Sequence, residues 1–386
     1  MTSVETRAGL RELIVCSLEE WNDVWRRNQF FVDILLRRNP SLHVLFVEPP
    51  ADVLHDLSQR RVPALPRSRG ITPDGRLRAI RPLKALPRRV GPLADALLLM
   101  QVRLAARAIG FSRPILWIND VTYAPLIRRT SWPSVYDITD DWLLAPFAPR
   151  ELERLRQLDQ LALEEADRVV VCSPALSATR GARREVAVIP NGVDVDHFRA
   201  PHPRPADLPR QPTAVYVGSL HDARLDIDLV VELARSLPEL SLVFVGENSL
   251  LPGSLARLSD FANVLLLGPR PYTSVPAYLQ HADVIIIPHV VSQFTESLDP
   301  IKVYECLAVR TPTVATPVAG FREHSGELMI AHPDEFVRRV AATVANPPRP
   351  NHHRAEPIGW TQRVRAFEEV LLASNSLNGV APTGRG

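Results

Sequence analysis

Lysine is almost absent from this chain: Lys84 and Lys302 are its only lysines, and arginine supplies the remaining basic residues. Cysteine is also scarce, and the wide spacing of Cys16, Cys172 and Cys306 excludes a disulfide framework or a zinc-ligand motif and favours a reducing compartment. No apolar run approaches the roughly 20 residues that a membrane-spanning helix needs. The polar first segment, 1–12, has no apolar signal core, so we expect a cytoplasmic protein.

Other absences narrow the function classes. The net charge of only +2 argues against a general polyanion-binding protein. The sequence has no recognised nucleic-acid-binding motif, so we expect no nucleic-acid partner. No Gly-x-Gly-x-x-Gly motif follows a predicted strand, which disfavours a nicotinamide-dependent dehydrogenase. At 386 residues the chain is too long for a single core, and two or three domains are expected.

Short apolar runs alternate with helical patterns, which indicates βαβ units and parallel sheets. In the first half we predict strands at Leu13–Ser17, His43–Val47, Arg78–Ile80, Ile115–Ile118, Ser134–Asp137, Arg168–Cys172 and Val186–Ile189, and helices at Val24–Arg38, Leu93–Ile109 and Pro149–Ala166. The second series has strands at Ala214–Val217, Leu242–Val245, Val264–Leu267, Val284–Ile287, Thr313–Ala315 and Glu327–Ile330, and helices at Asp226–Leu237, Ser274–Gln280, Pro300–Val309 and Asp334–Ala345. The fold class is therefore α/β, with two doubly wound domains facing across a cleft.

Proline marks the junction between the two series. Five prolines fall within Ala200–Pro212, which excludes a helix or a central strand there. We predict an N-terminal domain over 1–190, a connector over 191–212 and a C-terminal domain over 213–357. A last helix, Trp360–Ala373 within 358–373, is a candidate to pack back on the first domain, and 374–386 is expected to be a disordered tail.

The stretch 60–113 is rich in arginine, with 13 basic and two acidic residues. One interpretation is a patch for anionic lipid headgroups, which would place the protein peripherally on the inner face of a membrane, or for an anionic acceptor. The other is a solvated face made basic by overall composition. The sequence leaves both interpretations open.

The segment Asp299–Glu305 indicates a ligand site by its own chemistry. It opens a predicted helix and follows the predicted strand Val284–Ile287. In α/β proteins a strand, a loop and a helix N-terminus bind phosphate, because unpaired backbone N–H groups and the helix dipole favour an anion. Lys302 adds a compact ammonium group at this place.

Five local patterns occur in a characteristic order. They are Trp21–Gln29, Tyr136–Trp142, Val188–Asp194, Tyr216–Leu220 with Arg224 just beyond, and Asp299–Glu305 followed by Thr311–Ala315. With these segments the chain resembles the GT-B glycosyltransferases, specifically the retaining group called family 4. Within it, the chain resembles bacterial cell-surface polysaccharide enzymes with an N/D-P-x-K-x-x-E signature. The resemblance is strongest from Arg168 to Ala315 and implies two Rossmann-like domains.

This resemblance implies a nucleoside diphosphate sugar as donor, an unidentified acceptor, and neither a cofactor nor a metal ion. Lys302 and Arg224 are then expected to bind the diphosphate as catalytic cations, and Glu305 to accept the ribose hydroxyls. Asp140 is the candidate catalytic acid on the N-terminal side. The structural alternatives are an ion pair between Lys302 and Glu305 on the helix surface and a helix N-cap for Asp140.

Other positions follow from the same resemblance. Gly218 would let the backbone approach phosphate, Arg270 lies in the base-binding segment, and Arg27 and Gln29 start a helix that faces the acceptor. For Asn191 a tight turn at the domain junction is expected.

The chain departs from the family pattern at three positions. Thr139 replaces a common His, Ser219 a common Arg, and Ser297 the first acid of the late motif. The contact with the donor sugar is therefore assigned to Glu296, Ser297 or Asp299.

We therefore predict a glycosyltransferase that acts on an acceptor hydroxyl with retention of anomeric configuration, in cell-surface polysaccharide, glycolipid or secondary-metabolite synthesis. Two alternatives share the architecture. One is a nucleotide-sugar 2-epimerase, for which the chain lacks an obvious His-Glu set and offers His289 as the only late candidate in the cleft. The other is a non-catalytic partner protein, which the three departures keep open.

Overall fold

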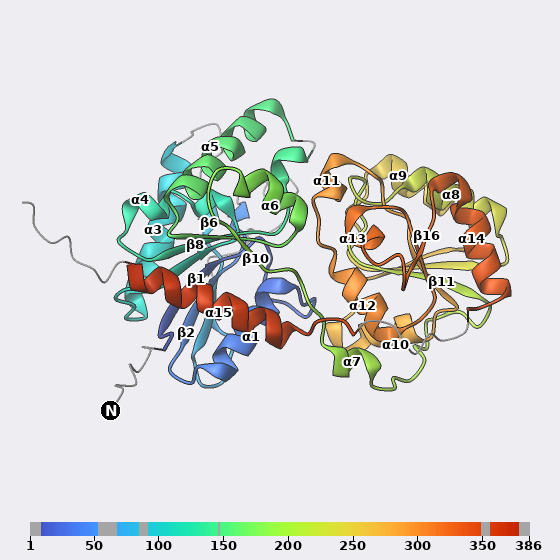
Figure 1. Ribbon diagram of the computed structural model, residues 1–386, viewed down its shortest axis with the longest axis horizontal. Helices are drawn as coiled ribbons and strands as arrows, with labels where there is room; N and C mark the ends of the chain where they lie inside the picture. Colours follow the sequence, from blue (N-terminus) through green and yellow to red (C-terminus); the bar gives the residue numbers. More distant parts are fainter. Residues whose placement is uncertain (1–8, 53–67, 85–91, 146, 349–355, 378–386) are drawn as a thin grey trace, which may run out of the picture.

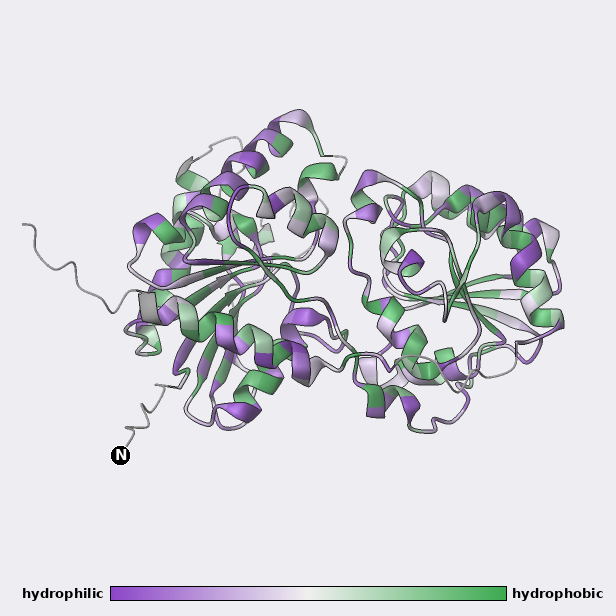
Figure 2. Cartoon of the chain, in the orientation of Figure 1, coloured by the Kyte–Doolittle hydropathy of each residue, from purple (hydrophilic) through white to green (hydrophobic). Residues whose placement is uncertain are grey.

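Two α/β lobes lie side by side in the computed structural model, which describes residues 9–52, 68–84, 92–145, 147–348 and 356–377 (Figure 1). The strands inside each lobe are mostly apolar, while the helices that cover them carry hydrophilic stripes (Figure 2). This is the pattern of parallel sheets buried on both faces.

The N-terminal lobe is built on an eight-stranded sheet with the order β10-β9-β8-β7-β1-β2-β5-β4. Its strands are β1 (Glu12–Cys16), β2 (His43–Val47), β4 (Ser68–Gly70), β5 (Leu77–Ile80), β7 (Ile115–Ile118), β8 (Ser134–Ile138), β9 (Arg168–Val171) and β10 (Ala187–Val188). Only β4 pairs in the antiparallel sense, with β5. The helices are α1 (Arg27–Arg38), α3 (Pro92–Ala108), α4 (Leu126–Arg129), α5 (Pro149–Glu165), α6 (Pro174–Gly181) and the 3-10 turns η2 (Val121–Tyr123) and η3 (Trp142–Leu144). A small sheet pairs β3 (Ala51–Asp52) with β6 (Leu83–Lys84).

The C-terminal lobe contains a six-stranded parallel sheet with the order β13-β12-β11-β14-β15-β16. Its strands are β11 (Thr213–Val217), β12 (Ser241–Val245), β13 (Val264–Gly268), β14 (Val284–Ile287), β15 (Thr313–Ala315) and β16 (Met329–Ile330). Its helices are α7 (Val195–Arg199), α8 (Ile227–Ser236), α9 (Pro252–Ser259), η4 (Tyr272–Ser274), α10 (Val275–Gln280), α11 (Gln293–Glu296), α12 (Ile301–Val309), α13 (Ala319–Arg322) and α14 (Pro333–Ala345). This is a second Rossmann-like unit, as predicted.

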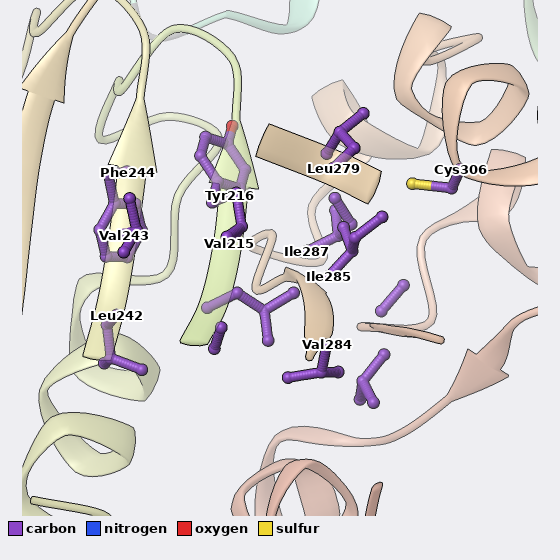
Figure 3. Packing of buried hydrophobic residues seen from close by; sticks show 14 of the residues in the cluster. Val215, Tyr216, Leu242, Val243, Phe244, Leu279, Val284, Ile285, Ile287 and Cys306 are labelled. Carbon is purple, nitrogen blue, oxygen red and sulfur yellow. The ribbon is translucent and has the colours of Figure 1, made fainter. Parts of the chain in front are cut away.

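Side chains alternate between the two faces of each sheet, and this decides which apolar core each strand residue joins. In β1, Leu13 and Val15 belong to one apolar cluster while Ile14 belongs to another, because successive side chains point to opposite faces. The C-terminal sheet shares one large cluster, in which Leu279 of α10 and Cys306 of α12 pack with the strand residues (Figure 3). All three cysteines are buried and free, in agreement with the absence of a disulfide framework.

The chain passes between the lobes twice. At this crossing the Val193 carbonyl accepts a hydrogen bond from the N–H of Trp360, at the start of α15 (Trp360–Leu377), and the Val193 N–H donates to the Ile358 carbonyl. The last helix α15 then packs on α1 and on the N-terminal sheet, and its Phe367 and Leu371 are buried in the apolar core of that lobe. Figure 1 shows it lying across this lobe.

Two boundaries differ from the prediction. The proline-rich segment packs on the C-terminal lobe, because Leu208 is buried in that core and Asp207 accepts hydrogen bonds from Tyr278 and Arg270. Helix α15 continues to Leu377, four residues beyond the predicted end, because Ser374 is fully buried and its hydroxyl donates to the Leu371 carbonyl. The remainder of the predicted tail, 378–386, lies outside the described residues.

Candidate active site

A cavity of about 230 Å³ lies between the two lobes. It is bounded by segments that follow β1, β7, β8, β11 and β14 and by the first residues of α1 and α12. Both sheets thus present the carboxyl ends of their strands to one space, where α/β domains bind ligands. Eight of the eleven predicted site residues line it, namely Arg27, Asp140, Gly218, Arg224, Arg270, Asp299, Lys302 and Glu305; Gln29, Glu296 and Ser297 do not.

Lys302 lies directly on the glycine that ends β11. A Cβ atom at Gly218 would be 2.3 Å from Lys302 Nζ, so any other residue there would push the end of the lysine side chain aside. Gly218 also has a φ of 144°, which side-chain-bearing residues rarely adopt. The ammonium lies 5.4 Å from the centre of the Tyr216 ring, in range of a cation–π contact. The ammonium therefore lies over this glycine, and the expected approach of the Gly218 backbone to a phosphate stays a prediction.

The N-terminus of α12 adds a second source of positive potential. Pro300 occupies its N-cap position, and no side chain caps the helix. The first backbone N–H groups of a helix have no intrahelical partner, and the dipole is positive at this end. Since Pro300, Ile301 and Lys302 all line the cavity, an anion bound here would meet both the helix end and the ammonium.

Arg224 bridges the cleft to Asp140. The guanidinium of the C-terminal lobe lies 3.1 Å from the Asp140 carboxylate of the N-terminal lobe. It also lies over the Phe294 ring, 5.6 Å from its centre. Burial raises the pKa of Asp140, while Arg224 and the Thr139 hydroxyl oppose this rise. Asp140 therefore balances the charge of Arg224, and an anionic ligand would compete with it for the guanidinium.

Glu305 lies one turn into α12, on the same cavity wall as Lys302. Burial raises its pKa to about 7, opposed by the positive charge of Lys302. Within the part of the chain that the structure describes, no ion pair joins Lys302 and Glu305, so the helix-surface pair is not formed. The carboxylate is thus free to accept hydrogen bonds from a ligand.

His289 is a cleft residue that sequence reasoning did not assign. It follows β14 and is buried, and its Nε2 lies 3.3 Å from the Tyr216 hydroxyl. Burial lowers its pKa well below the ordinary value, helped by the positive charges of Lys302 and Arg224. Its Nδ1 has no hydrogen-bond partner among the described residues. A neutral imidazole with one unused nitrogen therefore lies beside both cations.

Asp299 joins the two lobes. One carboxylate oxygen accepts from the Asn191 backbone N–H, and the other accepts from the Tyr304 hydroxyl at 2.7 Å. The Asn191 side chain in turn donates to the Asp299 carbonyl at 2.6 Å. Asp299 therefore lines the cavity with both carboxylate oxygens already engaged, and Asn191 has the junction role that was predicted.

The structure does not bring Glu296 or Ser297 to the cavity. The short helix α11, capped by the Ser292 side chain, ends at Glu296, which pairs at the surface with Arg322 at 2.6 Å. The Ser297 hydroxyl donates to the Phe294 carbonyl, and its own carbonyl accepts from Ser173 across the lobes, both at 2.7 Å. The expectation that one of these two residues contacts a donor sugar is not met by this arrangement.

Arg270 already has internal partners. Its guanidinium donates to Asp207 at 2.6 Å, to the Tyr278 hydroxyl at 3.0 Å and to the Leu267 carbonyl at 2.7 Å. These bonds hold the proline-rich segment against β13. Arg270 thus lines the cavity with its guanidinium already engaged, and its place in a base-binding segment stays a prediction.

Arg27 and Gln29 likewise have internal partners. Arg27 is buried and forms two hydrogen bonds to the carboxylate of Asp137, at 3.2 and 3.3 Å. Gln29 is fully buried, and its side chain accepts from the Arg26 N–H and donates to the Glu20 carbonyl. Because Asp137 already balances Arg27, a ligand anion would compete with it for the guanidinium, and the contact of Arg27 with a diphosphate or an acceptor anion stays a prediction.

Sequence reasoning missed a polar network on the N-terminal wall. Asn28 donates to Asn119 at 2.8 Å and to Glu19 at 3.2 Å, and Asn119 donates to Thr139 at 3.2 Å. Burial and the nearby Asp140 raise the pKa of Glu19. The available signal was positional, because Glu19, Asn119 and Thr139 all come directly after buried strands.

The described residues show neither a metal site nor a membrane span. No group of three or more His, Cys, Asp or Glu side chains has an arrangement that could hold a metal ion. No helix there combines the length and the apolar character needed to cross a membrane.

Comparison with known proteins supports the resemblance drawn from the motifs. Residues 211–346 match the family described as Glycosyl transferases group 1. The chain is 26% identical over 245 residues to the Putative teichuronic acid biosynthesis glycosyltransferase TuaH of Bacillus subtilis (strain 168). The aligned part spans 59% of this chain and 60% of that relative, somewhat less than two thirds of its length.

Solved structures with the same architecture cover almost the whole chain. An apo structure of OtsA aligns with a TM-score of 0.62 over 95% of this chain and 96% of its own, at 11% identity. The α,α-trehalose 6-phosphate synthase of Burkholderia multivorans has a TM-score of 0.59 over 96% and 95% of the two chains, at 13% identity. WaaG, described as a glycosyltransferase involved in lipopolysaccharide biosynthesis, has a TM-score of 0.59 over 96% of this chain and 100% of its own, at 13% identity. At these identities the likeness establishes the fold.

Proposed function

We propose that this chain, which has the two-domain GT-B fold and a C-terminal domain matching the group 1 glycosyl transferases, moves a sugar from a nucleoside diphosphate sugar to an acceptor hydroxyl. The observation that carries the proposal is the position of Lys302. Its ammonium lies on Gly218 at the uncapped N-terminus of α12, with Arg224 lining the same cavity. Two cations and a helix end in one cleft suit a diphosphate.

The donor would lie on the C-terminal wall. Lys302, Arg224 and the first N–H groups of α12 would bind the diphosphate. Glu305, one turn further along the helix, would accept the two ribose hydroxyls, since an ionised carboxylate has several acceptor sites. The unused nitrogen of His289 beside the cations would provide one further hydrogen bond to a donor oxygen.

The catalytic contribution would be electrostatic. As the bond between sugar and diphosphate breaks, negative charge grows on the departing oxygen, and fixed cations stabilise that charge. Arg224 would exchange its contact with Asp140 for the diphosphate. Asp140 would then be free to accept a hydrogen bond from the acceptor hydroxyl. Because the cations and the helix end act on the leaving group, we propose a reaction that needs no metal ion.

Retention of anomeric configuration and membership of family 4 are part of the proposal. They rest on the order of motifs from Val188–Asp194 to Asp299–Glu305. The named relative from Bacillus subtilis is a putative enzyme of teichuronic acid biosynthesis, and we propose a similar setting here: cell-surface polysaccharide, glycolipid or secondary-metabolite synthesis.

A cytoplasmic location with peripheral membrane contact belongs to the same proposal. Residues 60–67 and 85–91 of the basic region lie outside the described residues. In its described part, Leu93, Met100 and Leu104 are exposed along α3, next to Arg103 and Arg107. Flotation with anionic vesicles at low salt tests this contact, and a protein that stays at the bottom of the gradient contradicts it.

The decisive experiment supplies UDP-, GDP- and dTDP-sugars with and without acceptors and follows the products by mass spectrometry and NMR. Transfer that depends on acceptor, with an unchanged anomeric configuration, supports the proposal. A change in the donor sugar without acceptor would identify an epimerase. Nucleotide binding without turnover on any acceptor would identify a non-catalytic partner.

A further inference from the structure

A second cavity, of about 270 Å³, lies in the N-terminal lobe beside the cleft. It shares Asn119, Thr139 and Asp140 with the cleft cavity. The two spaces therefore meet at the carboxylate that faces Arg224. A group bound in the second cavity would lie next to the place where the diphosphate is proposed to bind.

The walls of this cavity are largely apolar. They come from β8, from η2 and η3, from the loop after η3 and from α5, and include Val121, Ile138, Trp142, Leu143, Phe147 and Leu155. Phe147 is 39% exposed, and its ring centre lies 6.2 Å from that of Trp142. Such walls favour an aromatic or alkyl group, because burying apolar surface is the main driving force for its binding.

Its charged groups do not suit an anion. The one basic residue in the lining is Arg180, and its guanidinium already lies 3.0 Å from Asp141 and 3.6 Å from Asp159. The remaining charged lining residues are the acids Asp120, Asp140, Glu151 and Asp159. A phosphate or carboxylate would meet repulsion without a free cation.

Two lining residues also carry buried donors without a partner. Trp142 Nε1 and Arg180 Nε make no hydrogen bond to any described residue. Leaving a buried donor unpaired costs free energy, so an oxygen acceptor that reached either atom would be favoured. A hydroxyl or ether oxygen of a glycoside or an alcohol is such an acceptor and carries no charge.

We infer that this cavity is the acceptor subsite and that it takes a neutral acceptor with an aromatic or alkyl group and rejects sugar phosphates. The inference rests on the proposed glycosyl transfer and adds to it the chemical class of acceptor. It also separates this chain from the structurally similar α,α-trehalose 6-phosphate synthase of Burkholderia multivorans.

Calorimetric titration tests the subsite without turnover. The full chain is titrated with 4-nitrophenyl β-D-glucoside and with glucose 6-phosphate. We expect the aryl glucoside to bind at least about tenfold more tightly than the sugar phosphate, since apolar burial favours one and charge repulsion disfavours the other. Equal or tighter binding of glucose 6-phosphate would overturn the inference.

Two neighbouring truncations supply a matched comparison. Phe147 lines the cavity, while Leu144, the last residue of η3, is similarly exposed, at 42%, and is not a lining residue. Phe147→Ala should weaken the aryl glucoside about fivefold or more, and Leu144→Ala by less than about twofold. Equal effects of the two variants would contradict the assignment. The same samples are also titrated with nucleoside diphosphate, which reports on the donor site. Nucleotide binding without the expected acceptor preference would refute only the acceptor assignment, whereas absence of nucleotide binding would count against the glycosyltransferase proposal.

Discussion

At the residue scale, the proposed diphosphate site depends most on Lys302. The chain uses arginine for almost every positive charge, yet places one of its two lysines where the cation must lie against a backbone glycine. An ammonium is compact and fits this space, whereas a planar guanidinium is larger. The choice of residue therefore follows from the geometry of the site.

Removing this ammonium should slow the reaction without unfolding the protein. We expect Lys302→Ala to lower turnover at least about tenfold, because a fixed charge on the leaving diphosphate is lost. Steady-state kinetics with the preferred donor measures the effect. The chain's other lysine, Lys84 in β6, offers Lys84→Ala as the control. Equal rates in the Lys302→Ala and Lys84→Ala variants would remove Lys302 from the mechanism.

Glu305 makes stability and binding depend on pH in opposite directions. Its pKa of about 7 in the folded chain exceeds the value of 4.5 expected without the fold. The protonated carboxyl is favoured by folding, so its contribution to stability is fully present below pH 4.5 and is lost as pH rises through about 7. Ligand hydroxyls, by contrast, need the ionised carboxylate as their acceptor.

The Glu305→Gln variant should remove both dependences. Between about pH 5 and about pH 7 the free energy of unfolding of the native chain should fall relative to that of Glu305→Gln. Over about pH 6 to pH 8 the native chain should gain affinity for nucleoside diphosphate, while the variant should change little. Urea unfolding and calorimetry measure the two quantities. Parallel pH curves for both proteins would show that Glu305 does not titrate in this range.

At the scale of elements, the site depends on the close approach of the end of β11 to α12. A Cβ at Gly218 would collide with the Lys302 side chain, and one at Gly246 would lie 2.1 Å from the Gly218 carbonyl oxygen. The strand end, the next strand end and the helix thus form a tightly packed unit. Any side chain introduced there must displace the ammonium or the backbone.

Gly218→Ala should therefore disturb function and stability together. The unusual φ and the collision predict a loss of about 1–3 kcal/mol in unfolding free energy and displacement of Lys302 from the diphosphate site. Gly253→Ala in α9 is the control, since nothing lies within 4 Å of the added Cβ. That change should be neutral or stabilise by about 0.4–1 kcal/mol. Denaturant unfolding compares the two, and an equally stable Gly218→Ala variant would disprove the packing argument.

Long elements were predictable from the sequence because their patterns are strong. Buried β-branched runs such as Val284–Ile287 have the predicted bounds, and α12 and α14 differ from prediction by one residue at their starts. Short helices such as α6, α9 and α11 were missed, since they depend on tertiary contacts rather than on periodicity. The β4 strand was missed because its three residues are all exposed, so the sequence shows no apolar pattern there.

The site was predictable where a motif and the backbone chemistry agree. Gly218, Lys302 and Glu305 lie together because one strand end and one helix start bring them there. Sequence alone did not reveal that Asp137 and Asp207 balance the charges of Arg27 and Arg270. Such partners come from distant segments and become visible only in the folded chain.

At the scale of the whole molecule, the two lobes are joined by contacts around the cleft. Asp140 pairs with Arg224 across it, Asn191 bonds Asp299, and Trp142 packs near Phe294 with ring centres 5.7 Å apart. A diphosphate that draws Arg224 away from Asp140 would change one of these contacts. Ligand binding would therefore alter the contacts that join the two lobes.

Titration of nucleoside diphosphates into the full chain tests the central claim most directly. UDP, GDP and dTDP are titrated by calorimetry into the native chain and into the Lys302→Ala and Lys84→Ala variants. The account predicts that at least one nucleotide binds the native chain and Lys84→Ala equally, and binds Lys302→Ala at least about tenfold more weakly. Absence of binding by all three nucleotides, or equal affinity in Lys302→Ala, would contradict it.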